Sequence, residues 1–286
     1  MNRLNRASRK LIFSLPLVLL LMLSANDNNR FYLSKALDPR EAHWVDSVFN
    51  AMSEAERIGQ LFMIRAHSDK GPEFEQQVAD LIGKYHVGGL CFFQGTPERQ
   101  AELTNRYQAL SNQVPLFIAM DAEWGLGMRL KETAISFPRQ IMLGAVQDNR
   151  LIYAMGRDLA RQCRRLGVHI NFAPVVDINN NPENPVIGDR SFGENQSNVG
   201  AKAFQYMMGL QDGGVLACAK HFPGHGDTNV DSHLDLPVIH YDYKRLDSLE
   251  LRPFRALSVT GVGGVMVAHL NLPAIDPRPN RPTTLS

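Results

Sequence analysis

The feature of the sequence that most restricts its fold is a repeated alternation of apolar, strand-like runs with helical segments. The apolar runs occupy residues 61–64, 87–93, 116–120, 170–176, 215–219 and 264–268. Helical patterns cover residues 41–55, 74–85, 97–113, 149–166, 197–209 and 247–257. Because the runs are apolar throughout rather than alternately apolar and polar, they are typical of a parallel sheet covered by helices.

Polar residues stand just past the ends of five of these strands, and they favour a barrel over a doubly wound sheet. They are His67, Asp121, Asp177, the pair Lys220 and His221, and His269. In a barrel the carboxyl ends of all strands meet on one face, and no Gly-x-Gly-x-x-Gly follows the first strand. We therefore predict an α/β fold, a (β/α)8 TIM-type barrel. It is incomplete, with about six of eight units before Ser286, which indicates a truncated protein.

The composition is that of a globular protein. The 286 residues are 44% hydrophobic and carry a net charge of +1, which gives no indication of a nucleic-acid partner. The three cysteines, Cys91, Cys163 and Cys218, include no closely spaced pair. We therefore predict buried free thiols rather than a disulfide framework or a zinc knuckle.

The first 25 residues have the layout of a secretory signal. Four basic residues within the first ten precede an apolar stretch over 11–23, and the small residues Ser24 and Ala25 follow. We predict a signal peptide or N-terminal membrane anchor over 1–25, a linker over 26–40 and the barrel domain over 41–286. The protein would be exported to the periplasm or the cell exterior, with the anchor as a membrane tether if it is not cleaved.

The densest group of ionisable side chains lies in residues 220–233, directly after the fifth apolar run, and we place it on a loop. It holds one lysine, three histidines and two aspartates. On such a loop Asp231 can hydrogen-bond His233, fix its tautomer and raise its basicity, which makes a proton-transfer group for neutral pH. We therefore predict Asp231 and His233 as catalytic residues.

Other polar residues suit a hydroxyl-rich ligand such as a sugar, because they offer many donors and a few acceptors. They are Asp121, Arg129, Arg190, Lys220 and His221. A metal site formed by His221, His225, Asp227 and His233 is an alternative, although Lys220 beside it would repel a cation. His225 and Asp227 have a second interpretation, in which they only pin the loop, and Glu123 is a candidate partner for an arginine. We expect neither a metal nor a cofactor.

At these residues the chain resembles family 3 glycoside hydrolases, in the β-N-acetylglucosaminidase branch that trims peptidoglycan fragments. Four motifs match in the family's order: IAMDAE at 118–123 with Arg129, NFAPVVD at 171–177, DRSFG at 189–193, and KHFPGHGD at 220–227 with DSH at 231–233. The last element matters most, because this branch takes its acid/base from that loop. The resemblance spans residues 41–286.

The resemblance implies a retaining mechanism on a glycan that contains N-acetylglucosamine. His233, oriented by Asp231, would protonate the leaving oxygen and then activate water, and the five residues named for the sugar would hold its hydroxyls. The family's nucleophile is an aspartate at the end of a seventh strand, and no such element stands before Ser286; Asp177 belongs to another motif. We therefore expect the full-length protein to be the enzyme and the 286-residue chain to be weakly active or inactive. A catalytically inactive carbohydrate-binding protein and a metal-dependent hydrolase are the alternatives, and a further C-terminal domain is left open.

Overall fold

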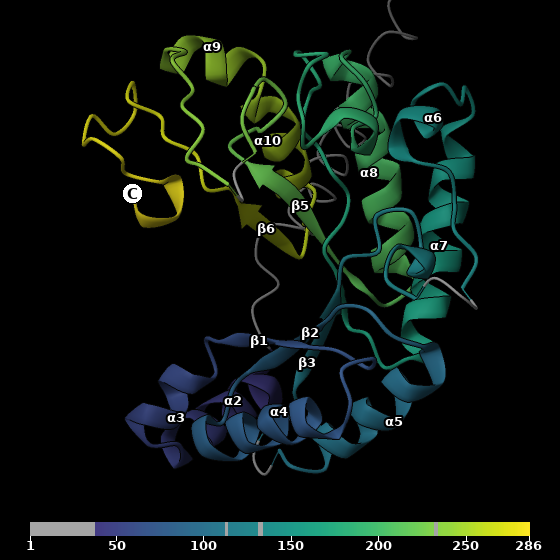
Figure 1. Cartoon of the computed structure of the whole chain (residues 1–286), viewed down its shortest axis with the longest axis vertical. Coiled ribbons are helices and arrows are strands. Elements are labelled where there is room, and N and C mark those ends of the chain that lie inside the picture. The colour runs from purple at the N-terminus through teal and green to yellow at the C-terminus, as the bar shows by residue number, and fades with distance from the viewer. Residues whose placement is uncertain (1–37, 112–113, 131–133, 232–233) are drawn as a thin grey trace, which may run out of the picture.

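A computed structural model describes residues 38–111, 114–130, 134–231 and 234–286. These residues form one sheet of six parallel strands in the order β1-β2-β3-β4-β5-β6. The strands are β1 Met63–Ala66, β2 Gly89–Phe92, β3 Phe117–Met120, β4 Ile170–Asn171, β5 Leu216–Phe222 and β6 Gly264–Val267. The sheet curls into a half-barrel with helices on its outer side (Figure 1). The expected incomplete barrel is confirmed.

The helices follow the strands along the chain. They are α2 Pro39–Ala51, α3 Glu54–Gly59, α4 Pro72–Tyr85, α5 Pro97–Gln108, α6 Gln140–Gly144, α7 Asn149–Arg165, α8 Gln196–Asp212, α9 Tyr243–Ser248 and α10 Leu251–Val259, with short 3₁₀ turns at Leu126–Met128, Gly188–Arg190 and Thr283–Leu285. In α7 the buried apolar residues recur at helical spacing, at Ile152, Met155, Leu159 and Cys163. That face packs the helix on the core.

Two glycines let α7 and α8 touch. A Cβ on Gly156 would lie 2.7 Å from the backbone oxygen of Tyr206, and one on Gly209 would lie 2.3 Å from that of Tyr153. Any larger residue at either position would push the helices apart. The close contact fixes α8, whose Tyr206 hydroxyl donates to the backbone oxygens of Ala122 and Glu123, 3.1 and 2.9 Å away. The packing of α7 against α8 therefore helps to position the backbone of Ala122 and Glu123, next to the site.

Several boundaries differ from the sequence prediction. The first strand starts at Met63 rather than residue 61, and the fourth ends at Asn171 because Pro174 has no N–H to extend the ladder. Lys220 and His221 lie within β5, not on the loop after it. The predicted helix over 247–257 is two helices, α9 and α10, and the one over 41–55 is also divided, because Ser53 caps α3.

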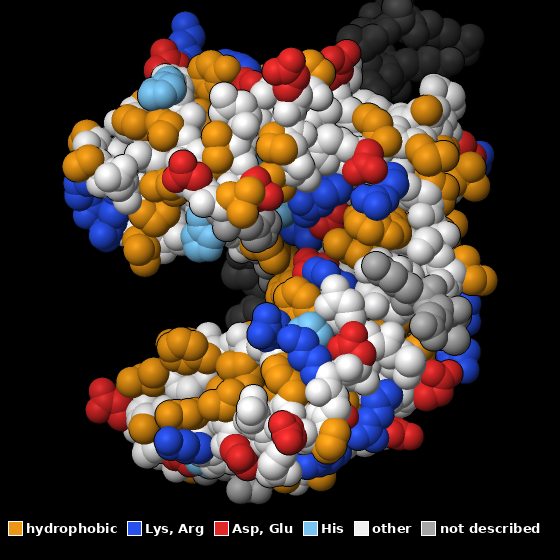
Figure 2. All heavy atoms as spheres, viewed as in Figure 1, with side chains coloured by type: hydrophobic (Ala, Val, Ile, Leu, Met, Phe, Trp, Pro, Cys, Tyr) orange, Lys and Arg blue, Asp and Glu red, His pale blue; other side chains and the backbone are white. Residues whose placement is uncertain are grey.

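The apolar face predicted for the first helix does not pack on a core. No described residue of α2 is buried, and Trp44 and Phe49 are 55% and 53% exposed. The edge strands β1 and β6 do not pair with each other within the described residues. A deep hollow separates the parts of the molecule that carry them, and hydrophobic side chains gather along it (Figure 2).

The described part of the chain contains no helix with both the length and the apolar character to cross a bilayer. Residues 1–25 and nearly all of 26–40 lie outside the described residues. The signal peptide or anchor and the linker therefore stay predictions.

Candidate active site

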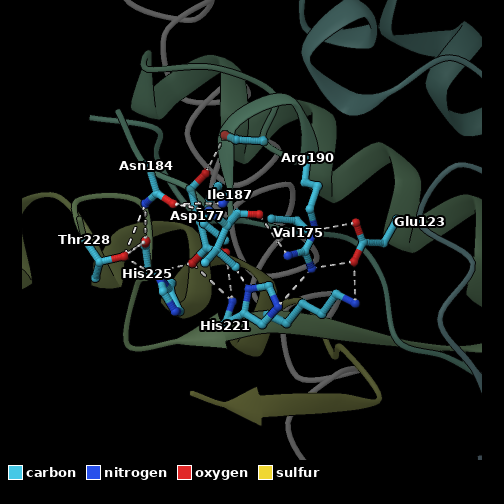
Figure 3. A network of polar contacts seen from close by, with 12 residues as sticks. Glu123, Val175, Asp177, Asn184, Ile187, Arg190, His221, His225 and Thr228 are labelled. Carbon is cyan, nitrogen blue, oxygen red and sulfur yellow. Dashed lines mark hydrogen bonds and ion pairs between the residues drawn. The ribbon is translucent and has the colours of Figure 1, made fainter. Parts of the chain in front are cut away.

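The site lies at the carboxyl ends of β3, β4 and β5, where parallel strands bring residues distant in sequence together. Asp121 follows β3 directly, Asp177 follows the β4 segment, and Lys220 and His221 lie near the end of β5. Arg190 comes from the 3₁₀ turn Gly188–Arg190. Figure 3 shows how Arg190, Glu123, His221 and Asp177 point toward one another.

Lys220 is the centre of the site. It is 1% exposed, and its Nζ lies 2.8 Å from Asp121 Oδ1 and 2.7 Å from Glu123 Oε1. Arg129 Nη2 donates to Asp121 Oδ2 at 2.5 Å. Arg190 holds Glu123 with two bonds, from Nε at 3.0 Å and from Nη2 at 2.7 Å. Two carboxylates are thus clamped between three cations.

The charges in this cluster outweigh the cost of burying them. Burial alone would raise the pKa of Glu123, but the charges of Lys220 and Arg190 lower it to about 2. In the same way burial would raise the pKa of Asp121, and Lys220 and Arg129 lower it. Burial would lower the pKa of Lys220, and Glu123 and Asp121 raise it. All these groups are therefore charged at neutral pH.

The pKa of Glu123 predicts a pH dependence of stability. The ordinary glutamate value is 4.5 and the folded value is about 2, so the ionised carboxylate stabilises the fold fully above about pH 4.5 and loses that effect as the pH falls toward about 2. We expect the free energy of unfolding, measured with urea at steps from about pH 6 to 2, to fall over this window. Glu123→Gln should reduce the slope, and Glu98→Gln at an exposed position should leave it unchanged. Equal slopes in both variants would contradict the assignment.

His221 is held in one tautomer. Its Nδ1 lies 2.7 Å from Asp177 Oδ2, and its Nε2 lies 3.2 Å from Arg190 Nη2. A guanidinium can only donate, so Nε2 accepts and Nδ1 carries the proton that is donated to Asp177. The backbone N–H groups of His221 and His225 also donate to Asp177, at 3.2 and 2.7 Å. His221 is therefore fixed from both sides.

Asp177 is the buried support of this half of the site. Burial alone would raise the pKa of its carboxyl, but His221 and the His225 N–H more than offset that effect and lower it. Around it, Asn184 Nδ2 donates to the His225 carbonyl at 2.8 Å, and the Thr228 hydroxyl lies 2.8 Å from His225 Nδ1 (Figure 3). Asp177 is not among the predicted site residues, although its place just past a strand marks it in the same way as Asp121. The predicted pairing of Glu123 with an arginine is confirmed, and the arginine is Arg190.

The structure brings together all five residues that the sequence nominated for the sugar: Asp121, Arg129, Arg190, Lys220 and His221. The predicted catalytic pair is placed only in part. Asp231 is half-buried on the loop after β5, and its carbonyl accepts from the N–H groups of Leu234 and Asp235. His233 lies outside the described residues. The Asp231–His233 pairing therefore stays a prediction.

The three residues of the metal alternative that the structure describes have other partners, and His233 lies outside the described residues. His221 faces Asp177, the Nδ1 of His225 faces Thr228, and Asp227 accepts from the Tyr241 hydroxyl at 2.6 Å. Across the described ranges, no group of three or more His, Cys, Asp or Glu side chains is placed to hold a metal ion. The loop-pinning interpretation fits His225 and Asp227 better, because their contacts close the loop onto its own ends.

The match to protein families agrees with this geometry. The glycosyl hydrolase family 3 N-terminal domain matches residues 54–286. The chain belongs to glycoside hydrolase family 3. The resemblance seen in the sequence motifs is thereby confirmed.

Named relatives and solved structures within family 3 are similar over most of this chain. It is 38% identical over 212 residues to "Beta-hexosaminidase A" of Pseudoalteromonas piscicida, which covers 70% of this chain and 36% of that protein. It is 35% identical over 237 residues to "Beta-hexosaminidase LpqI" of Mycobacterium tuberculosis, with 78% and 56% covered. A family 3 β-N-acetylglucosaminidase structure from Paenibacillus sp. str. FPU-7 has a TM-score of 0.75 at 40% identity, with 82% and 45% covered. The chain thus spans between 36% and 56% of the length of these proteins.

Proposed function

We propose that this barrel belongs to a β-N-acetylhexosaminidase that removes terminal, non-reducing β-linked N-acetylglucosamine. The observation that carries the proposal is the convergence of Asp121, Arg129, Arg190, Lys220 and His221 at the carboxyl ends of the strands. The relatives named above as β-hexosaminidases support the substrate class. Peptidoglycan-derived glycans as substrate, and export from the cytoplasm, are part of the proposal.

The mechanism we propose is the retaining one, in which a carboxylate attacks the anomeric carbon and a second group handles the proton. Glu123 and Asp177 are fully buried and already paired, and Asp121 has a cation on each oxygen. These three carboxylates are therefore committed to holding the site and its ligand. The nucleophile would be another carboxylate, which the family resemblance places at the end of a seventh strand.

The remaining roles follow from what each group offers. Asp121, with Lys220 and Arg129 on its two oxygens, would accept from sugar hydroxyls while the two cations donate. Beside them Arg190 would donate, and His221 would accept through Nε2, the nitrogen that carries no proton. His233 would protonate the leaving oxygen and then activate water, with Asp231 orienting its ring. A membrane tether through residues 1–25 and a further C-terminal domain are compatible with this function.

An assay with two chromogenic substrates tests the proposal. The protein, with any sequence that its reading frame adds after Ser286, is expected to release N-acetylglucosamine from the β-linked p-nitrophenyl glycoside and to hydrolyse the β-glucoside poorly. NMR of the first product should show the β-anomer, since a retaining mechanism conserves configuration. Comparable rates on both substrates would point to another branch of the family. Binding of N-acetylglucosamine without turnover would favour the inactive carbohydrate-binding protein.

A further inference from the structure

We infer that Phe93 is a positioning residue of this site: its ring, supported by His67, holds the Arg129 guanidinium in the plane in which it clamps Asp121. The inference rests on the proposed function only for the ligand used in one of its tests. It concerns His67, which follows β1, and Phe93, which follows β2. Neither residue belongs to the four motifs that match the family.

The stack consists of three side chains at the carboxyl ends of the first strands. Arg129 Cζ lies 4.6 Å from the centroid of the Phe93 ring, within the range of a cation–π contact. The His67 ring is stacked on Phe93, with centroids 5.4 Å apart and planes 19° apart. His67 in turn meets the edge of Phe74 of α4, at 5.5 Å and 86°. These ring contacts connect α4 with the proposed sugar site.

Arg129 needs this support because few bonds hold it. Its Nη2 donates to Asp121 at 2.5 Å, while its Nε is buried and has no hydrogen-bond partner among the described residues. A single bond at the tip of a long side chain leaves the guanidinium plane free to rotate. Arginine stacks readily on aromatic faces, and the Phe93 ring supplies the second point that defines the plane.

The charges around the stack agree with this role. Burial, together with the neighbouring charge of Lys70, lowers the pKa of His67 below its ordinary 6.5. His67 is therefore neutral near pH 7 and adds no repulsion to Arg129. Its ring nitrogens form no hydrogen bond within the described residues, and its Nδ1 lies 3.4 Å from Asp69 Oδ1. His67 thus contributes to this part of the site mainly through its ring contacts.

A change in the orientation of Arg129 would act directly on Asp121. Lys220 holds Oδ1 and Arg129 holds Oδ2, so a rotated Arg129 would release one oxygen of the ligand-binding carboxylate. The other site contacts, including Glu123–Arg190 and His221–Asp177, do not involve Phe93. Losing the ring should therefore weaken ligand binding without disturbing proton transfer.

The first test is kinetic. In the protein with any sequence that its reading frame adds after Ser286, Phe93→Leu is expected to raise KM for the p-nitrophenyl N-acetyl-β-glucosaminide about tenfold. The kcat should stay within about twofold, since uniform binding is lost. Phe93→Tyr keeps the aromatic face and should restore KM. The matched control is Phe49→Leu, which removes an equivalent contact, Arg57 Cζ at 4.0 Å from the Phe49 ring, away from the site. An unchanged KM in Phe93→Leu, or an equal rise in Phe49→Leu, would overturn the inference.

The second test needs no turnover and separates this inference from the proposed function. The Nε–H proton of Arg129, identified in a ¹⁵N spectrum by its loss in Arg129→Lys, should be shifted upfield by the Phe93 ring. The shift should vanish in Phe93→Leu and persist in Phe93→Tyr. If the protein with any sequence that follows Ser286 in its reading frame hydrolyses no glycoside but shows the shifted resonance, the proposed function is wrong and the positioning role stands. A wild-type resonance at the ordinary arginine position would overturn the positioning role, whether or not Phe93→Leu folds.

Discussion

Replacing Lys220 with methionine is expected to lower the free energy of unfolding by about 3–5 kcal/mol. The Nζ of Lys220 is shared by Asp121 and Glu123, at 2.8 and 2.7 Å, and the side chain has almost no contact with solvent. Methionine fills much of the same volume but leaves the buried Glu123 and the half-buried Asp121 facing each other without the cation between them. Urea unfolding at neutral pH measures the effect, and binding of N-acetylglucosamine should be lost in the same variant.

The chain offers a matched control for this result. Lys202 is equally buried, but its Nζ donates to neutral oxygens, the Val146 carbonyl at 2.5 Å and Asn149 Oδ1 at 2.9 Å. Lys202→Met should therefore destabilise less than Lys220→Met, because no carboxylate loses a cation with it. Adding Glu123→Gln to Lys220→Met should cost less than the sum of the single variants. Equal losses in the two lysine variants would show that the ion pairs of Lys220 contribute little to stability.

The sequence was sufficient to predict the sheet and the convergence of polar residues at its carboxyl edge for one physical reason. Apolar runs mark strands buried on both faces, and parallel strands bring their carboxyl ends to one side. Asp121 and Lys220 are 99 positions apart in the sequence, and for this reason the Nζ of Lys220 still lies 2.8 Å from Asp121 Oδ1. Both residues could be predicted as site residues from their places near strand ends, without any knowledge of the tertiary packing.

Other features depend on contacts that local patterns do not contain. The periodicity of α2 shows where its apolar face lies but not whether anything covers it, and Trp44 is exposed. In the sequence, Glu123 and Asp177 look like ordinary acidic residues near strand ends. In the fold both are buried, and cations and N–H groups from distant segments pair with their carboxylates. Phe93 is apolar, so its place after a strand does not mark it as a site residue in the sequence. Its contact with Arg129 exists only because β2 and the segment after β3 are neighbours in the sheet.

His233→Ala is expected to slow turnover about 10²–10⁴-fold on substrates with poor leaving groups. A sugar leaves as a strongly basic oxygen and needs a proton from the acid, whereas a nitrophenolate departs without one. The variant should therefore retain most of its first-step rate on the aryl glycoside and lose it on a disaccharide. Steady-state and single-turnover kinetics on both substrates measure the contrast, in the protein with any sequence that follows Ser286 in its reading frame.

Two companion variants separate proton transfer from binding. Asp231→Ala should reproduce the pattern of His233→Ala with a smaller loss, because Asp231 orients the ring without transferring the proton itself. Asp121→Ala should instead slow hydrolysis of both substrates, since its carboxylate lies between two cations in the group proposed to hold the sugar. The role proposed for Asp121 does not depend on the leaving group. Added azide should rescue the second step of His233→Ala by replacing activated water. A uniform loss across leaving groups without azide rescue would remove His233 from the acid/base role and direct the search to another donor on the same face of the barrel.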